Sequence, residues 1–251
     1  GTLGVTGVLT GTSLDISGDI DVDGTTNLDI VDIDGAVQLD ATLTVGVNDT
    51  GYDVTFFGAT ANYNVAVGDE AGTAITTGDE NTFVGYTAGD AVTTASANTG
   101  VGYAALSANT SGTQNSAFGN RAGDAITTGD GNTAIGYFSL STTTTSDNNT
   151  AVGVDSLGLN TTGADNTAIG KDALRANTTA SSNTAVGSSA LVANTTGAGN
   201  VAFGAEALSV NILGSNSTAI GREALRQQNP ATATDAHNTA VGYRAGLLVS
   251  T

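Results

Sequence analysis

The sequence predicts an all-β protein whose main part is a parallel β-solenoid, or β-roll, of seventeen-residue coils. First, a pentapeptide of the form Asn-Thr-Ala-Val-Gly recurs in step after about residue 63. Its glycine falls at Gly68, Gly85, Gly102, Gly119, Gly136, Gly153, Gly170, Gly187, Gly204, Gly221 and, after a four-residue insertion, Gly242. Second, Gly, Thr, Ala, Asn and Val dominate, and helix formers at a 3.6-residue spacing are missing. A fixed period of this size indicates one small unit stacked along an axis.

The pentapeptide is predicted to be a short strand. With Asn as position 1 and the glycine as position 5, position 2 is usually Thr, position 3 nearly always Ala, and position 4 Val, Ile or Phe. This period-2 alternation gives one bulky face and one face of Ala and Gly. Small residues on a strand indicate that another backbone lies close by. We expect either a second strand of the same coil or a neighbouring subunit there.

Positions 6 to 12 show which side chains face inward. Asp, Tyr, Lys, Arg, Ser and Ala all occur at position 6, so this position is expected to face water. Position 8 is always Ala or Ser, which indicates a tight internal site. Glycine at position 9 accompanies Ile or Val at position 12, as in Gly72 with Ile75; leucine at position 9 accompanies Asn, Thr or Gln, as in Leu106 with Asn109. Constant core volume explains this exchange, because voids and overpacking both destabilise. Positions 9 and 12 should line a common interior.

The rest of each repeat is rich in turn residues. Positions 13–17 often read Thr-Thr-Gly-x-x, as in Thr127–Gly131. We expect two short strands and two turns per coil, with eleven stacked coils about 50 Å long. The asparagine at position 1 either forms a side-chain ladder along the stack or is a simple turn former.

Residues 1–50 follow another pattern, in which apolar and polar residues alternate between Gly or Thr-Thr punctuation, as in Asp19–Gly24. So few large apolar residues would bury a core only if several chains shared it. The predicted organisation is a trimeric β-structured stalk at 1–50, a junction at 51–63 and a β-roll of eleven repeats at 64–251.

An acidic motif in the stalk resembles a calcium loop in part. Asp19, Asp21 and Asp23 precede Gly24, but the twelfth residue is Ile30 where an EF-hand needs a bidentate Glu. The EF-hand is rejected. A loose calcium site between neighbouring chains and the polar face of a strand both remain open.

Charge and composition exclude several classes of partner. The net charge is −18, and residues 1–120 carry no Lys or Arg, so nucleic acid and anionic membranes should repel the chain. This acidity fits cation binding, life in a salty medium, or simply a solvated surface that resists aggregation. No apolar run approaches the roughly 20 residues that cross a bilayer, and disulfides are excluded because cysteine is absent.

The sequence does not indicate an enzyme. His237 is the only histidine and lies in the irregular insertion, and no phosphate-binding loop carries a lysine. Asp69–Glu70 and Asp79–Glu80 could cluster as a carboxylate pair for glycoside cleavage, with exposed tyrosines such as Tyr86 as platforms. We assign no catalytic, metal-ligating or cofactor-binding residue, expect no cofactor, and leave ligand-contacting residues unknown.

The repeats NTAIGYFSL (132–140), NTAIGKDAL (166–174) and NTAVGSSAL (183–191) resemble repeats of bacteriophage tail fibres and related trimeric surface proteins. They are also similar to the head repeats of trimeric autotransporter adhesins, whose pattern is closer to Ser-Val-Ala-Ile-Gly. The resemblance covers residues 64–246. It implies a homotrimer of left-handed β-rolls whose Ala/Gly faces pack toward their neighbours.

The resemblance implies a function as a structural fibre of a phage virion that contacts other tail proteins and attaches to a host-surface glycan or protein. A C-terminal self-cleaving chaperone domain, common in such fibres, is not recognised. The first alternative is an extracellular adhesin head on a bacterial surface, which would need an anchor or a heptad stalk. The second is an ice- or mineral-binding solenoid, which would need Thr-x-Thr rows. Adjacent threonines such as Thr161–Thr162 are instead expected to point to opposite faces.

Overall fold

The computed structural model describes residues 44–45, 54–55, 63–230, 232 and 235–249. The chain divides into two units, Gly1–Leu39 and Asp40–Thr251, and all described residues belong to the second. The predicted stalk and junction, with the Asp19–Gly24 motif, therefore lie largely outside the described residues.

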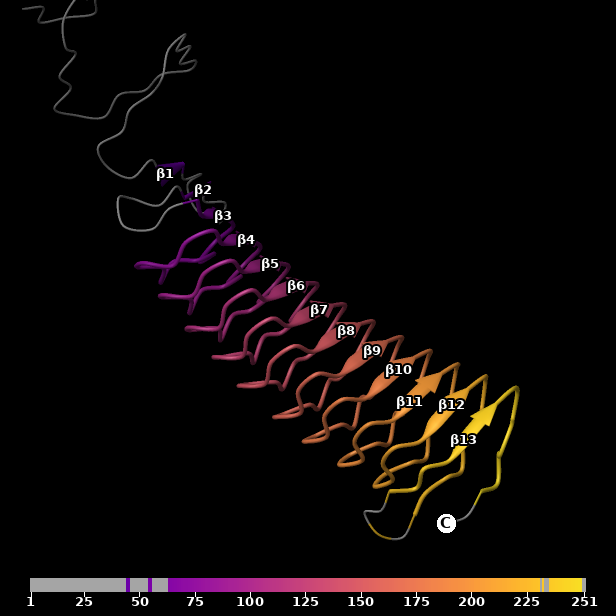
Figure 1. Cartoon of the computed structure of the whole chain (residues 1–251). Coiled ribbons are helices and arrows are strands. Elements are labelled where there is room, and N and C mark those ends of the chain that lie inside the picture. Colours follow the sequence, from indigo (N-terminus) through magenta and orange to yellow (C-terminus); the bar gives the residue numbers. More distant parts are fainter. Residues whose placement is uncertain (1–43, 46–53, 56–62, 231, 233–234, 250–251) are drawn as a thin grey trace, which may run out of the picture. The chain divides into compact units, whose positions relative to one another are not determined.

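The solenoid contains one three-residue strand per repeat, stacked side by side (Figure 1). These strands are β3 (Val65–Val67), β4 (Thr82–Val84), β5 (Thr99–Val101), β6 (Ser116–Phe118), β7 (Thr133–Ile135), β8 (Thr150–Val152), β9 (Thr167–Ile169), β10 (Thr184–Val186), β11 (Val201–Phe203), β12 (Thr218–Ile220) and β13 (Thr239–Val241). Two further strands, β1 (Thr44–Val45) and β2 (Val54–Thr55), precede them.

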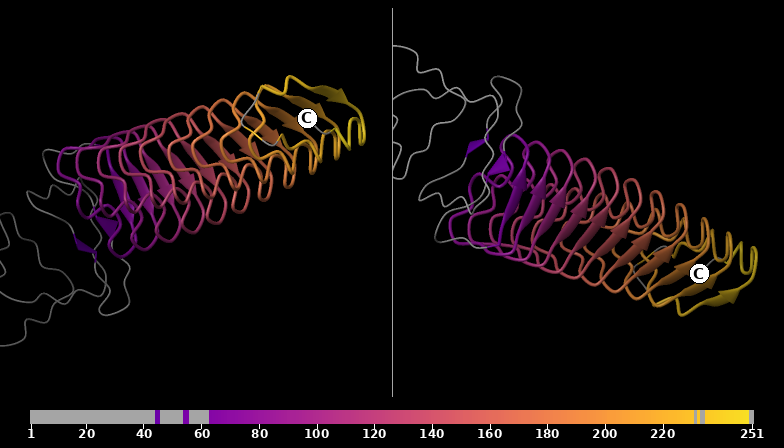
Figure 2. Two further views of the ribbon diagram at one scale, coloured as in Figure 1. Left: turned by 90° about the horizontal axis from the view of Figure 1, so that it is seen from below. Right: turned by 90° about the horizontal axis from the view of Figure 1, so that it is seen from above.

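Every neighbouring pair from β3 to β13 is parallel and in register, so that each residue pairs with its own equivalent in the next coil. The predicted parallel β-solenoid of seventeen-residue coils is thus confirmed. At its N-terminal end, β2 pairs with β3 and β1 with β2 in the antiparallel sense. The strands form one sheet along one side of the solenoid, and turns form the other sides (Figure 2).

The expectation of two strands per coil was wrong. Beyond the strand, every coil makes a tight turn in which the N–H of position 8 donates to the carbonyl of position 5, as Ala88 does to Gly85. In every coil but that of Leu140, a second turn follows in which the N–H of position 12 donates to the carbonyl of position 9, as Val92 does to Gly89. Turns in successive coils also bond to each other, as Gly89 N–H does to the Ala105 carbonyl at 2.9 Å. The stack is therefore held by backbone bonds on all its sides.

Positive φ angles explain why no second strand forms. Position 5 is a glycine with φ near +130°, and positions 7, 9 and 17 adopt the left-handed conformation, as in Asp155 (φ 54°), Leu157 (φ 49°) and Asp165 (φ 58°). Left-handed backbone costs a non-glycine residue about 1–2 kcal/mol. Such corners interrupt an extended chain, and the hydrogen bonds between coils must offset their strain.

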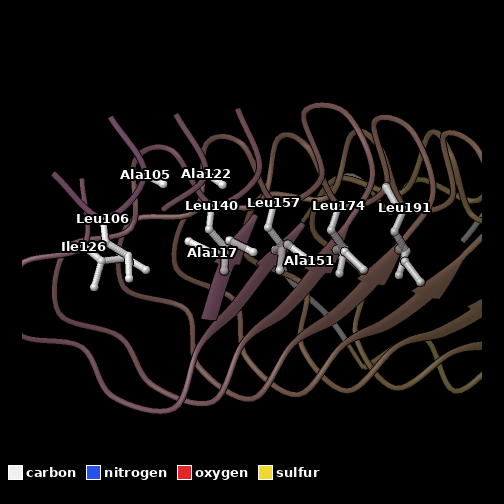
Figure 3. Close-up of a cluster of buried hydrophobic side chains, with 14 of the residues drawn as sticks. Ala105, Leu106, Ala117, Ala122, Ile126, Leu140, Ala151, Leu157, Leu174 and Leu191 are labelled. Carbon is white, nitrogen blue, oxygen red and sulfur yellow. The ribbon is translucent and has the colours of Figure 1, made fainter. Parts of the chain in front are cut away.

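The core lies inside each coil, between the sheet and the turns. Position 3 alanines, such as Ala117 and Ala151, are fully buried there, and the leucines of position 9 stack in one column against them (Figure 3). The small face of the strand therefore packs within its own coil. The expectation that alanine faces a neighbouring subunit was wrong, and the bulky residues of position 4 point outward instead.

The predicted exchange between positions 9 and 12 is confirmed. A Cβ at Gly123 would lie 3.0 Å from the Ile126 Cδ1 atom, so isoleucine fills the space that leucine takes in other coils. A second compensation surrounds Phe83, the buried aromatic residue at position 3. A Cβ at Gly89 would approach its ring to 2.4 Å and one at Gly100 to 3.0 Å, so both glycines make room for it.

The asparagine ladder is also confirmed. Position 1 side chains are buried from Asn64 to Asn200, and each side-chain oxygen in the ladder accepts from the backbone N–H seventeen residues on, as Asn166 Oδ1 does from Asn183 at 3.0 Å. A second, shorter ladder occupies position 12, where Asn177 Nδ2 donates to Asn160 Oδ1 and Asn194 Nδ2 to Asn177 Oδ1. In three coils the two meet at one carbonyl, that of Gly112, Ala180 or Gly214. Ala180 O, for example, accepts from Asn166 and Asn177 Nδ2, both at 2.9 Å.

We predict that Gly153→Ala destabilises the solenoid by about 3 kcal/mol or more, because it adds backbone strain and overlap. Its Cβ would lie 2.6 Å from the Gly170 carbonyl oxygen at φ +133°. Gly242→Ala is the matched control: φ is +125° but the nearest atom, the Ala245 Cβ, is 3.9 Å away. We expect it to cost about 1 kcal/mol of backbone strain. Urea unfolding measures both, and equal losses would contradict the stacking explanation.

We predict that Asn166→Ala lowers the free energy of unfolding by about 3 kcal/mol, since buried groups that lose a partner cost about 1–3 kcal/mol each. The change removes the side-chain bonds to Asn149, Ala180 and Asn183. Thr162→Ala, at an exposed position of the preceding coil, should change stability by less than about 0.5 kcal/mol. Thermal unfolding followed by circular dichroism compares the two, and similar melting curves would refute a structural role for the ladder.

Candidate functional site

An apolar row covers the outer face of the sheet. Position 4 is apolar in every coil, and its side chains point away from the core. Their exposed fraction is 40% at Ile135, 56% at Phe203 and 67% at Val241 in the last coil. The row consists of Val67, Val84, Val101, Phe118, Ile135, Val152, Ile169, Val186, Phe203, Ile220 and Val241.

Position 2 runs beside this row on the same face, because residues two apart in a strand share a face. It is Thr in eight coils, Ser116 in one, and Val65 and Val201 in the other two. We call positions 2 and 4 of β3 to β13 the sheet face. It carries no charged residue, although the chain has a net charge of −18.

The corner that follows each strand holds the most varied side chains. Position 6 is exposed in nine coils and half-buried in Asp69 and Ala205, which confirms that it faces water. Aromatic rings gather on the first coils of this corner: Tyr86 and Tyr103 stack at 5.6 Å between centroids, and Tyr137 meets Phe138 edge to face at 4.4 Å. Because Tyr86 and Tyr103 stack on each other, they cover part of the flat surface that a sugar platform would offer.

All six cations of the chain lie on this same corner, at positions 6, 7 and 10. They are Arg121, Lys171, Arg175, Arg222, Arg226 and Arg244. Each forms an ion pair with a carboxylate of the corner. Sequence reasoning missed this grouping, although numbering the cations by repeat position would have found it.

The ion pairs are concentrated near the C-terminal end of the solenoid. Glu223 accepts from Arg244 Nε at 2.7 Å and lies 3.2 Å from Arg222 Nη2. The hydrogen bond from Arg244 holds the pKa of Glu223 below its usual range. Arg226 Nε lies 2.9 Å from Glu206 Oε2 without the angle of a hydrogen bond. The cations here outnumber the carboxylates that they pair with, since Glu223 forms ion pairs with two arginines.

The N-terminal part of the corner is acidic. Glu70 is the main cause of a raised pKa at Tyr86, with smaller contributions from desolvation and from Asp69. Burial raises the pKa of Asp90 and of Asp124, and each has a buried Oδ1 without a hydrogen-bond partner. These carboxylates at position 10 therefore favour their protonated form more than free aspartate does.

The carboxylate cluster that the sequence left possible does not form. Asp69–Glu70 follow β3, whereas Asp79–Glu80 precede β4, and the two strands are parallel and in register. The two pairs therefore lie at opposite ends of these strands, roughly 15 Å apart, beyond the spacing that glycoside cleavage uses. Within the described residues, no three His, Cys, Asp or Glu side chains gather as metal ligands, and His237 is exposed in the insertion.

The paired threonines do not point to opposite faces. Thr161 and Thr162 are both exposed because they lie in a bend instead of a strand. The hydroxyl of position 13 donates to the position 13 carbonyl of the next coil, as Thr161 Oγ1 does to Thr178 at 2.9 Å. The alternation on the sheet face is Thr with an apolar residue, so a Thr-x-Thr row is absent from β3 to β13.

We predict that Asp124→Asn stabilises the protein at pH 7 by up to about 1 kcal/mol, because it removes a partly buried charge. The pKa of Asp124 is raised in the folded state, so wild-type stability rises as pH falls through that pKa, and the advantage of the variant should vanish at pH 3. Melting temperatures at both pH values measure this. A variant less stable than wild type at pH 7 would show that the ion pair with Arg121 outweighs burial.

Comparisons with protein-family models, with curated proteins and with solved structures find no match to this chain. In the part of the chain that the structure describes, no helix has the length and apolar character needed to cross a membrane. The surfaces described above are therefore the basis for a functional proposal.

Proposed function

We propose that this chain is a structural fibre protein of a phage virion that assembles as a homotrimer, projects from the particle and contacts the host surface. The apolar row carries the proposal. It lies on an exposed sheet face and extends over all eleven coils, and contiguous apolar surface of that extent is typical of an interface.

The repeats themselves serve as an internal comparison of exposed positions. Ile135 and Tyr137 are exposed to similar extents, 40% and 50%. Yet position 4 is apolar in all eleven coils, whereas position 6 includes Asp69, Lys171 and Ser188. Strand propensity does not explain the difference, since threonine serves a strand as well as valine does and already occupies position 2. A constraint beyond the fold of one chain must keep position 4 apolar.

A second copy of this chain is the partner that fits the apolar row. A globular partner would cover only a few coils, whereas a parallel copy has the same rise per coil and matches the row throughout. The sheet face is also uncharged, so it is the side on which two chains of net charge −18 can approach with least repulsion.

The size of the sheet face agrees with a stable assembly. Eleven coils of about 4.8 Å make it roughly 50 Å long, and a width of about 10 Å gives an area on the order of 500 Å² for the stripe alone. Side chains flanking it would bring the contact near the roughly 800 Å² per partner of specific interfaces. A threefold arrangement agrees with the trimeric surface proteins that the repeats resemble.

In this arrangement the corner of positions 6, 7 and 10 stays at the outside, available to other virion proteins and to a glycan or protein of the host surface. A bacterial adhesin head would use the same assembly and is the first alternative. An ice- or mineral-binding solenoid is the second alternative, and it would require a free sheet face on a monomer.

Light scattering on the purified chain tests the assembly, and we predict a mass near three times 24.5 kDa. The double variant Ile135→Asp, Ile169→Asp should dissociate to one chain while keeping its circular dichroism spectrum, because it buries charge between copies. The matched control is Tyr137→Asp, Ser188→Asp, at position 6, where Asp69 occurs naturally. It should leave the mass unchanged.

A monomeric wild type would refute the fibre assembly and favour a solenoid with a free binding face. A trimer that survives the position 4 variant would place the interface elsewhere. Labelling of phage particles with an antibody against this chain tests the virion assignment, and absence of label from projecting fibres would favour the adhesin.

A further inference from the structure

We infer that the corner of residues 166–249 binds an anionic polymer of the host surface, through phosphate or carboxylate groups. We define this cationic corner as Lys171, Arg175, Arg222, Arg226 and Arg244. The inference rests on the proposed function, since it assumes that the corner faces outward from the fibre.

The first argument is the distribution of charge along the solenoid. Residues 64–165 carry ten acids and one cation, whereas residues 166–249 carry four acids and five cations. On the cationic corner itself the only carboxylates are Asp172, Glu206 and Glu223. Within residues 166–249, five cations on three carboxylates leave an excess of two positive charges, which Asp155 at the same corner of the adjoining coil reduces to one.

The second argument is that the scaffold does not need these cations. Position 6 holds Lys171 and Arg222 in two coils, but Ser188 in another. Position 10 holds Arg175 and Arg226, but Val192 and Ser209 in the two coils between them. Isolated exposed ion pairs contribute only about 0–1 kcal/mol to stability. Stability alone therefore gives little reason to gather all cations on one corner.

The third argument is that the guanidinium groups remain accessible. The side chains of Arg222 and Arg244 are 62% and 51% exposed while paired with Glu223, which is 4% exposed. The buried carboxylate orients both arginines and leaves their other N–H groups toward solvent. Oriented arginines bind phosphate and carboxylate in a bidentate manner.

The geometry favours an extended ligand. Lys171 and Arg175 lie three coils from Arg222 and Arg226, a separation of about 14 Å. A polymer with repeated anionic groups can contact both groups of cations at once, and a single ion cannot. At physiological ionic strength the Debye length is about 8 Å, so such a polymer is largely screened from the acids of the distant coils.

The experiment measures binding of the intact wild-type protein to immobilised poly(glycerol phosphate) and polygalacturonate, with neutral dextran as the reference polymer. We expect binding to one or both anionic polymers and no binding to dextran. The binding should weaken as the salt concentration rises from 0.05 to 0.5 M, since the Debye length falls from about 14 to about 4 Å over this range. The phosphate and carboxylate arms distinguish the two sources of anionic groups.

The variant Arg222→Ser, Arg226→Ser should weaken this binding at least tenfold, a magnitude expected for two charge-assisted contacts. Each serine already occurs at the same position of another coil, at Ser188 and Ser209. Arg121→Ala is the matched control, since it removes the one cation outside the cationic corner and alanine occupies its position at Ala104. It should retain binding.

No binding to either anionic polymer, or equal binding by the double variant and wild type, would overturn the inference. The mass of each protein in solution is measured alongside. A wild type that is trimeric but does not bind would refute the anionic ligand alone, whereas a monomeric wild type would refute the fibre assembly, whatever its binding.

Discussion

In-register stacking of identical coils is the constraint on which the rest of this structure depends. From β3 to β12 each strand residue lies beside its own equivalent seventeen positions away, as Ala134 lies beside Ala151, and the insertion lengthens this spacing only before β13. Such neighbours must tolerate themselves at about 4.8 Å. Asparagine and threonine both donate and accept and therefore pair with copies of themselves, whereas like charges repel by about 1 kcal/mol even in water. This explains why a chain rich in Asn and Thr has only 12% charged residues.

The same stacking explains how a strained backbone persists. Non-glycine residues at positive φ recur at positions 7, 9 and 17, and leucine is among them, as in Leu174 (φ 50°). A left-handed leucine would be costly in isolation. Here its N–H bonds to the next coil, Leu174 to Ala190 at 3.0 Å, and its side chain is fully buried. Each corner is stabilised by the coils on both sides, so the hydrogen bonds between coils offset its strain along the stack. This compensation is weakest in the two end coils, which have a neighbour on one side only.

The sequence predicted what repetition encodes and missed what depends on backbone angles. The coil length, the exchange between positions 9 and 12, and the asparagine ladder as one of two open interpretations all followed from comparing copies. The second strand was wrong because Asp155 or Leu157 in a left-handed corner carries no compositional signal; only glycines such as Gly89 gave a hint, and they also fitted the volume argument. Alternation likewise identified the alanine face without showing that leucine from the same coil covers it.

Because the copies share one scaffold, they separate constraints of the fold from constraints of function. Positions 3 and 9 vary where a neighbour compensates, as the glycines around Phe83 show. Position 6 varies freely, so the fold does not require the cations and aromatic rings that occur there. Position 4 is the exception: it is exposed in six coils and half-buried in five, yet uniformly apolar. An exposed row that behaves like a core position is best explained by a partner that buries it, and a partner with the same period is another copy of the chain.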